Sequence, residues 1–68
     1  MMLVKSEKTD GIKTEIYQVS HKHFQVIQDG EEVCSPVTSM KDLRFFWGVA
    51  LIIAGEKAAK ARGEGKWS

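Results

Sequence analysis

Residues 45–55 contain no charged side chain, and this run constrains the fold more than any other part of the sequence. A helix start precedes the run: the Ser39 hydroxyl can cap an early amide, and Asp42 suits the positive end of a helix. Gly63 is a typical stop signal at the other end. We therefore predict one long helix over residues 39–62.

The apolar side chains of this helix fall into two stripes when they are placed at about 100° per residue. The broader stripe comprises Leu43, Phe46, Trp47, Ala50, Ile53 and Ala54. The second stripe comprises Phe45, Val49 and Ile52. A small sheet covers about one such stripe, so the second is expected to remain as an exposed apolar patch that marks a binding surface.

Three arrangements compete for the second stripe. Residues 1–4 could fold back and cover it. Insertion into a membrane surface would need a cationic polar face, which a run that is apolar almost all round does not provide. Pairing with the helix of a second copy is the arrangement we favour, with Phe45, Val49 and Ile52 in the interface.

The residues before the helix predict an antiparallel meander over 12–35. Residues 12–19, 24–28 and 31–35 favour strands, and Pro36 ends the third by removing a ladder donor. Asp29-Gly30 is the strongest turn signal, because a type I′ hairpin needs positive φ at both central residues. Residues 1–11 are interpreted as a lead-in, which is polar and loosely ordered from residue 5.

The hairpin predicts a pairing register in which Gln28 faces Glu31, Val26 faces Val33, and Phe24 faces Ser35. If Val19 pairs with Phe24 across a turn at residues 21–22, one sheet face becomes apolar and forms the floor of the core. That face would carry Tyr17, Val19, Phe24, Val26 and Val33.

The predicted fold class is therefore α+β, a three-stranded antiparallel meander followed by one helix packed on one sheet face (β-β-β-α). The 68 residues form a single domain with a flexible tail over 63–68, near the lower limit for one apolar core. Chains this small usually gain support from disulfides, a metal or oligomerisation. The single cysteine, Cys34, excludes a disulfide within the chain, so oligomerisation is the expected support.

Residues suited to catalysis or metal binding are few. His21 and His23 lie in a predicted turn without a third ligand at a defined spacing, and Cys34 has no basic neighbour that would activate its thiol. A pocket of ordinary size is also difficult to build from one helix and one small sheet. We expect no enzyme activity, no cofactor and no bound metal.

The formal charge is +1, from ten basic and nine acidic residues, which gives no general affinity for phosphates. A basic cluster at the end of the helix and in the tail still offers possible nucleic-acid contacts. These are Lys57, Lys60, Arg62, Lys66 and Trp67. No segment reaches the roughly 20 apolar residues needed to cross a bilayer, and no signal peptide is evident. We expect a soluble, cytoplasmic protein without a membrane partner.

These observations favour a small non-catalytic protein–protein interaction module, a regulator, adaptor or inhibitor of a larger partner, that acts as a homodimer through the helix. The alternative is a nucleic-acid-associated accessory protein that uses the basic C-terminal segment.

Overall fold

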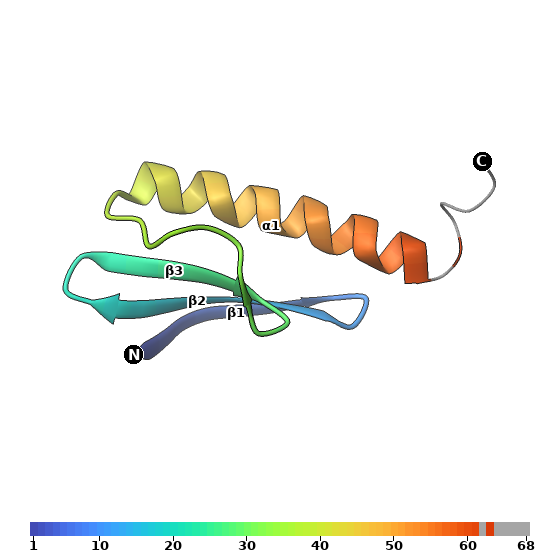
Figure 1. Ribbon diagram of the computed structural model, residues 1–68, viewed down its shortest axis with the longest axis horizontal. Coiled ribbons are helices and arrows are strands. Elements are labelled where there is room, and N and C mark those ends of the chain that lie inside the picture. Colours follow the sequence, from blue (N-terminus) through green and yellow to red (C-terminus); the bar gives the residue numbers. More distant parts are fainter. Residues whose placement is uncertain (62, 64–68) are drawn as a thin grey trace.

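The described part of the chain forms one antiparallel sheet with a single helix across one of its faces (Figure 1). The computed structural model describes residues 1–61 and 63. Its strands are β1 (Met2–Thr9), β2 (Ile12–Ser20), β3 (His23–Gln28) and the short β4 (Glu31–Glu32), ordered β1-β2-β3-β4 across the sheet. Helix α1 spans Met40–Ala61. The predicted α+β class, the meander and the C-terminal helix are confirmed.

The prediction of a lead-in over residues 1–11 is wrong, because Met2–Thr9 form strand β1 at the edge of the sheet. The turn into β2 is Asp10-Gly11, with φ of 48° and 89° at the two residues. The same dipeptide, Asp-Gly, forms the turn between β3 and β4. The strand was missed because nearly all of its side chains are exposed, so it has no alternation of apolar and polar residues to reveal it.

The hairpin between β3 and β4 forms at Asp29-Gly30 as predicted, with φ of 49° and 83°. Gln28 pairs with Glu31, and the Val33 amide donates to the Val26 carbonyl at 2.9 Å, in the predicted register.

Beyond Val33, the chain leaves the predicted strand over residues 31–35. The Gln25 side-chain amide donates to the Cys34 carbonyl, and Phe24 pairs with Val37 instead of Ser35. Two backbone hydrogen bonds of 2.9 and 2.8 Å join Phe24 to Val37. A side chain therefore takes the place of the sheet ladder just before Pro36, which has no amide hydrogen to donate.

The predicted register between β2 and β3 is wrong by one residue. The turn is where we expected it, since Ser20 pairs with His23. Val19, however, lies at a register shift, and beyond it Ile16 rather than Tyr17 faces Val26. One extra residue in a strand moves every following side chain to the opposite face. Ile16 consequently joins the core.

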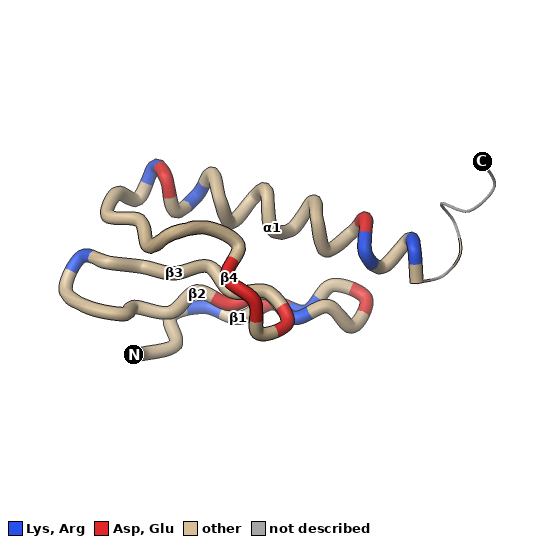
Figure 2. The backbone as a smooth tube through the Cα atoms, in the orientation of Figure 1, with Lys and Arg blue, Asp and Glu red and all other residues tan. Residues whose placement is uncertain are grey.

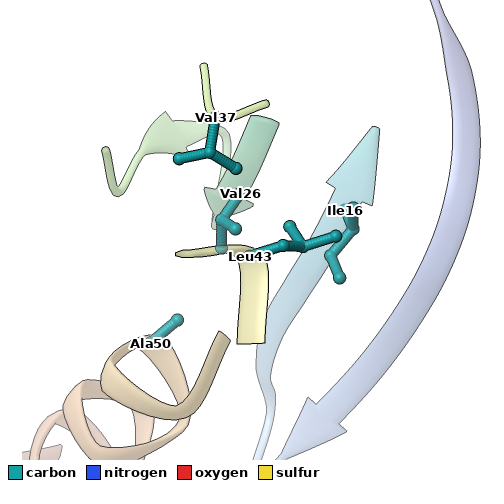
Figure 3. Close-up of a cluster of buried hydrophobic side chains, with 5 residues drawn as sticks. All are labelled: Ile16, Val26, Val37, Leu43 and Ala50. Carbon is teal, nitrogen blue, oxygen red and sulfur yellow. The ribbon is translucent and has the colours of Figure 1, made fainter. Parts of the chain in front are cut away.

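The core lies between the sheet and α1, where side chains from β2, β3, the β4–α1 loop and the helix converge (Figure 3). Its buried members are Ile16, Val26, Val37, Leu43 and Ala50, and Phe24, Val33, Cys34, Phe46 and Trp47 pack against them while partly buried. The helix buries Ala54 and Ala58 as well, so small side chains follow one face of α1 at intervals of four residues. The broader predicted stripe therefore does face the sheet.

A buried polar cluster connects three elements in this layer. The Gln28 side-chain amide donates to the Ala50 carbonyl at 2.7 Å and to the Thr14 hydroxyl at 3.1 Å. Thr14 and Gln28 are 0% and 2% exposed, so both would be costly to bury without these bonds.

The predicted signals at both ends of the helix, Ser39 and Gly63, are present in the structure. The Ser39 hydroxyl accepts a hydrogen bond from the Asp42 amide at 3.1 Å. Gly63 has a φ of 83° and donates its amide to the Lys60 carbonyl at 3.0 Å. Such a left-handed glycine is common where a helix stops.

Replacing Gly30 with valine should destabilise the protein by about 1–2 kcal/mol, because a β-branched residue strongly disfavours positive φ. Among the described residues, no atom beyond the two chain neighbours lies within 4 Å of the position of the added Cβ, so backbone strain and not a clash is the cause. Chemical denaturation at fixed protein concentration measures the effect. Gly30→Asn, which tolerates this conformation, should be much milder; equal losses for both variants would argue against the turn.

Replacing Gln28 with leucine should cost about 1–3 kcal/mol, because the Thr14 hydroxyl then loses its buried donor. The double variant Thr14→Val/Gln28→Leu should recover part of this loss, since both polar partners are then removed together. A double-mutant cycle in urea tests the coupling. Strictly additive effects would show that the hydrogen bond contributes nothing.

Candidate interaction surface

The second apolar stripe lies on the side of α1 that faces away from the sheet. We call Phe45, Val49 and Ile52 the outer face. Phe45 and Ile52 are each 64% exposed, whereas Val49 is half-buried. The Phe45 ring meets the Phe46 ring edge-on, with centroids 5.2 Å apart and an interplanar angle of 82°. Because Phe46 packs against the core, this contact restrains the exposed ring.

No charge interrupts the middle of the outer face. Figure 2 shows the middle of the helix entirely in tan, the colour of residues other than Lys, Arg, Asp and Glu, and in the sequence this part lies between Arg44 and Glu56. An apolar surface of this kind remains in water only at a cost, and on a small protein it is typical of a binding site.

The N-terminal residues do not cover the outer face. Met2, Leu3 and Val4 belong to β1, on the sheet and away from the outer side of the helix (Figure 1). They are themselves 61%, 50% and 51% exposed. The arrangement in which residues 1–4 fold back over the second stripe is therefore wrong for this structure.

A pocket of about 310 Å³ opens between β1 and the first half of α1. It is lined by Val4, Lys5, Ile16, Met40, Leu43, Arg44 and Trp47. The Lys5 ammonium lies 5.0 Å from the centre of the Trp47 ring, a cation–π contact that ties the edge strand to the helix. Among the described residues, the lining has two cations and no carboxylate, so the pocket suits an apolar group that has a negative charge.

A smaller pocket of about 190 Å³ lies on the opposite flank of the helix. Gln28, Glu31, Glu32, Val33, Ile53 and Lys57 line it. Glu31 and Glu32 of β4 thus share this pocket with Lys57, one of the predicted nucleic-acid contacts. Charges of both signs share this pocket, which disfavours a polyanion there.

Among the described residues, the histidines and the cysteine are not gathered into a metal-binding site. His21 and His23 are exposed at the β2–β3 turn, and His23 Nδ1 lies 3.1 Å from the His21 carbonyl oxygen. Across residues 1–61 and 63, no group of three or more His, Cys, Asp or Glu side chains could hold a metal ion.

The Cys34 thiol is partly buried against the core. Burial raises the pKa of Cys34, and the Glu32 carboxylate acts in the same direction, while a backbone hydrogen bond from Val26 opposes them. A higher pKa leaves less of the reactive thiolate at neutral pH.

Only part of the predicted basic cluster can be placed. Lys57 and Lys60 are exposed near the end of α1. Arg62, Lys66 and Trp67 lie outside the described residues. Within the described part of the chain, no helix has both the length and the apolar character needed to cross a membrane.

Comparison with known proteins gives no relative: no family model, no curated protein and no solved structure matches this chain. The function is therefore inferred from its surfaces. Two are prominent in the described residues, the outer face of α1 and the exposed edge strand β1.

The edge strand β1 was not predicted from the sequence, although Asp10-Gly11 is a turn signal that could have indicated it.

Tyr17 offers a titration that checks the face of the sheet opposite the helix. Its hydroxyl donates to Glu15 Oε2 at 2.8 Å, and this bond, with burial and the nearby negative charge, raises the pKa of Tyr17 above 10.0. The neutral phenol is thus favoured by folding. Its stabilising contribution is present below pH 10.0 and is lost as the pH rises through the raised pKa.

Absorbance of tyrosinate should give a midpoint above 10.0, and Glu15→Ala should return it toward that value. Tyr17 is the only tyrosine, so the signal has a single source. Lys13→Ala is the control, because it removes the cation 3.6 Å from Glu15 but keeps the hydrogen bond. An unchanged midpoint in Glu15→Ala would contradict the pairing.

Proposed function

We propose that this protein is a non-catalytic interaction module that self-associates through the outer face of α1 and binds a larger protein partner. The observation that supports this most is the 64% exposure of Phe45 and Ile52 on an uncharged helix face. In a symmetric dimer, the outer face of each copy covers that of the other, so the apolar surface of both copies is removed from water.

Two helix glycines add support. Gly48 and Gly55 lie seven residues apart beside the outer face, and each costs about 1 kcal/mol of helix stability relative to alanine. In the described part of the chain, no atom outside the local helix backbone and the two neighbouring residues lies within 4 Å of the position that a Cβ would occupy at either glycine. Packing within the chain therefore does not require glycine there, whereas close approach of a second helix would explain both.

The small size of the chain also favours association. It has 68 residues and a single cysteine, and its core includes three buried alanines on the helix. Large apolar side chains that would strengthen a core, Phe45 and Ile52, are instead directed outward. Burial of these residues between subunits would supply the support that a chain of this size otherwise obtains from disulfides or metals.

The absence of catalysis is part of the proposal. The titratable side chains lining the larger pocket are Lys5 and Arg44, and neither histidine nor Cys34 contributes to it. Two cations without an acid–base partner are suited to holding a charge and not to moving a proton.

Ile52→Glu should abolish association through the outer face and lower the mass of the assembly while the far-ultraviolet circular dichroism stays that of a folded protein, because charges at the centre of an apolar interface cannot be buried unpaired. Sedimentation at about 100 µM measures the mass, since interfaces this apolar are generally stable. Lys60→Glu, a change to the same residue at another exposed position near the helix end, is the matched control. A monomeric unmodified chain would refute the proposed interface.

Capture from the native host, with Ile52→Glu as the matched negative sample, then tests for the partner. Proteins retained by the unmodified chain and lost from the variant support the module. Binding to DNA or RNA that weakens steeply with salt, and disappears when Lys57, Lys60, Arg62 and Lys66 are replaced, would favour the nucleic-acid function in its place.

A further inference from the structure

Strand β1 presents a long open edge. It covers Met2–Thr9, pairs with β2 alone, and is exposed along all but its last residue. The opposite edge of the sheet is the two-residue β4, followed by a chain segment that returns to pair with Phe24. A long edge with unpaired amides and carbonyls is a template for another strand.

The hydrogen-bonding direction along β1 follows from its neighbour. The Lys13 carbonyl accepts a bond from the Asp29 amide, so the backbone of Lys13 points toward β3. Directions alternate along a strand, and Thr14 and Ile16 therefore point toward β1. Their partners Glu7 and Lys5 bond inward.

Ser6 and Lys8 alternate with Lys5 and Glu7 along β1. Their backbone amides and carbonyls consequently point toward the open edge. A second strand added here would bond to Ser6 and Lys8, with Lys5 and Glu7 at the non-hydrogen-bonded positions. At such positions opposing side chains lie closest together, with Cα atoms about 4.5 Å apart.

We propose that β1 pairs antiparallel with β1 of a second copy about a twofold axis through Ser6. This joins two four-stranded sheets into one continuous sheet. Ser6 then faces itself through two symmetric hydrogen bonds, and Lys5 of each copy faces Glu7 of the other. The contact goes beyond the helix interface proposed above and uses a different surface.

Charge complementarity favours this register over those centred on Lys5, Glu7 or Lys8. A twofold axis of an antiparallel strand pair is perpendicular to the sheet, so paired residues share a face and one residue lies opposite itself. An axis at Lys5, Glu7 or Lys8 would place like charges directly opposite, which is destabilising. The axis at Ser6 instead forms two Lys5–Glu7 pairs and places Val4 opposite Lys8.

The contact with Trp47 prepares Lys5 for this role. The ammonium lies 5.0 Å from the indole ring, so the lysine is held on the helix side of the sheet. Glu7 shares that side, because it lies two residues further along the same strand. In the pair, each lysine would lie between its own tryptophan ring and the carboxylate of the second copy.

A disulfide trap tests the register directly. In a Cys34→Ser background, Ser6→Cys should form a disulfide-linked dimer on mild oxidation, because the residue faces its own copy across the axis. Lys8→Cys is the matched control on the same strand and the same edge. It would face Val4 and should crosslink at least tenfold more slowly, since its own copy lies four residues away. Equal rates, or no crosslink at position 6, would overturn the proposal.

Charge reversal gives a second readout at equilibrium. Lys5→Glu or Glu7→Lys should each weaken the edge contact by about tenfold, because two attractive pairs become two repulsive ones. The double variant Lys5→Glu/Glu7→Lys should restore it. Sedimentation in an Ile52→Glu background isolates the edge from the helix interface, so failure of one contact is distinguishable from failure of the other. A double variant as weak as the single ones would overturn the register.

Discussion

The hydrogen bond from the Gln28 side chain to the Ala50 carbonyl is the interaction on which the arrangement of the two layers depends. It joins the end of β3 to the middle of α1, and the same amide also bonds to Thr14 on β2. A glutamine can reach a helix carbonyl only where the helix comes close. The alanines at positions 50, 54 and 58 provide that closeness, because a methyl group is all that separates the helix backbone from the sheet.

This contact also determines which face of the helix is left outside. With Ala50 fixed against the sheet, residues about 180° away on the helix must point outward, and these include Phe45 and Ile52. Larger residues at the alanine positions would hold the helix further from the sheet and leave Gln28 buried without its acceptor. The apolar outer face is thus a consequence of the same packing that completes the core.

The sequence predicts the helix well, because its evidence is local. A capping serine, a first-turn aspartate and a terminal glycine each act within one turn, and the uncharged run separates into stripes at the helical period. The Asp29-Gly30 turn is predictable for the same reason, since positive φ is a property of two adjacent residues. The outer face is predictable because the helix and its division into two stripes are both predictable.

The sheet is less predictable, because its pairing depends on contacts between residues that are distant in the sequence. The extra residue at Val19 changes the face of Ile16 and Tyr17, and no local signal in the turn announces it. The end of the last strand depends on Gln25 reaching the Cys34 carbonyl. Strand β1 has no buried face, so the periodicity that reveals most strands is absent, and with it the edge surface.

The two proposed contacts are compatible because they use different sides of the molecule. A twofold axis perpendicular to the sheet at β1 places both helices on the same side of the joined sheet. Since α1 lies over β2 and β3, about two strand spacings from that axis, the two helices would be roughly 19 Å apart. Packed helices lie about 8–10 Å apart, so the edge contact does not bury either outer face. An edge-paired dimer would therefore present two apolar outer faces in the same direction. A second edge-paired dimer, with two outer faces of its own, would gain from binding both at once, through the high effective concentration of the second face.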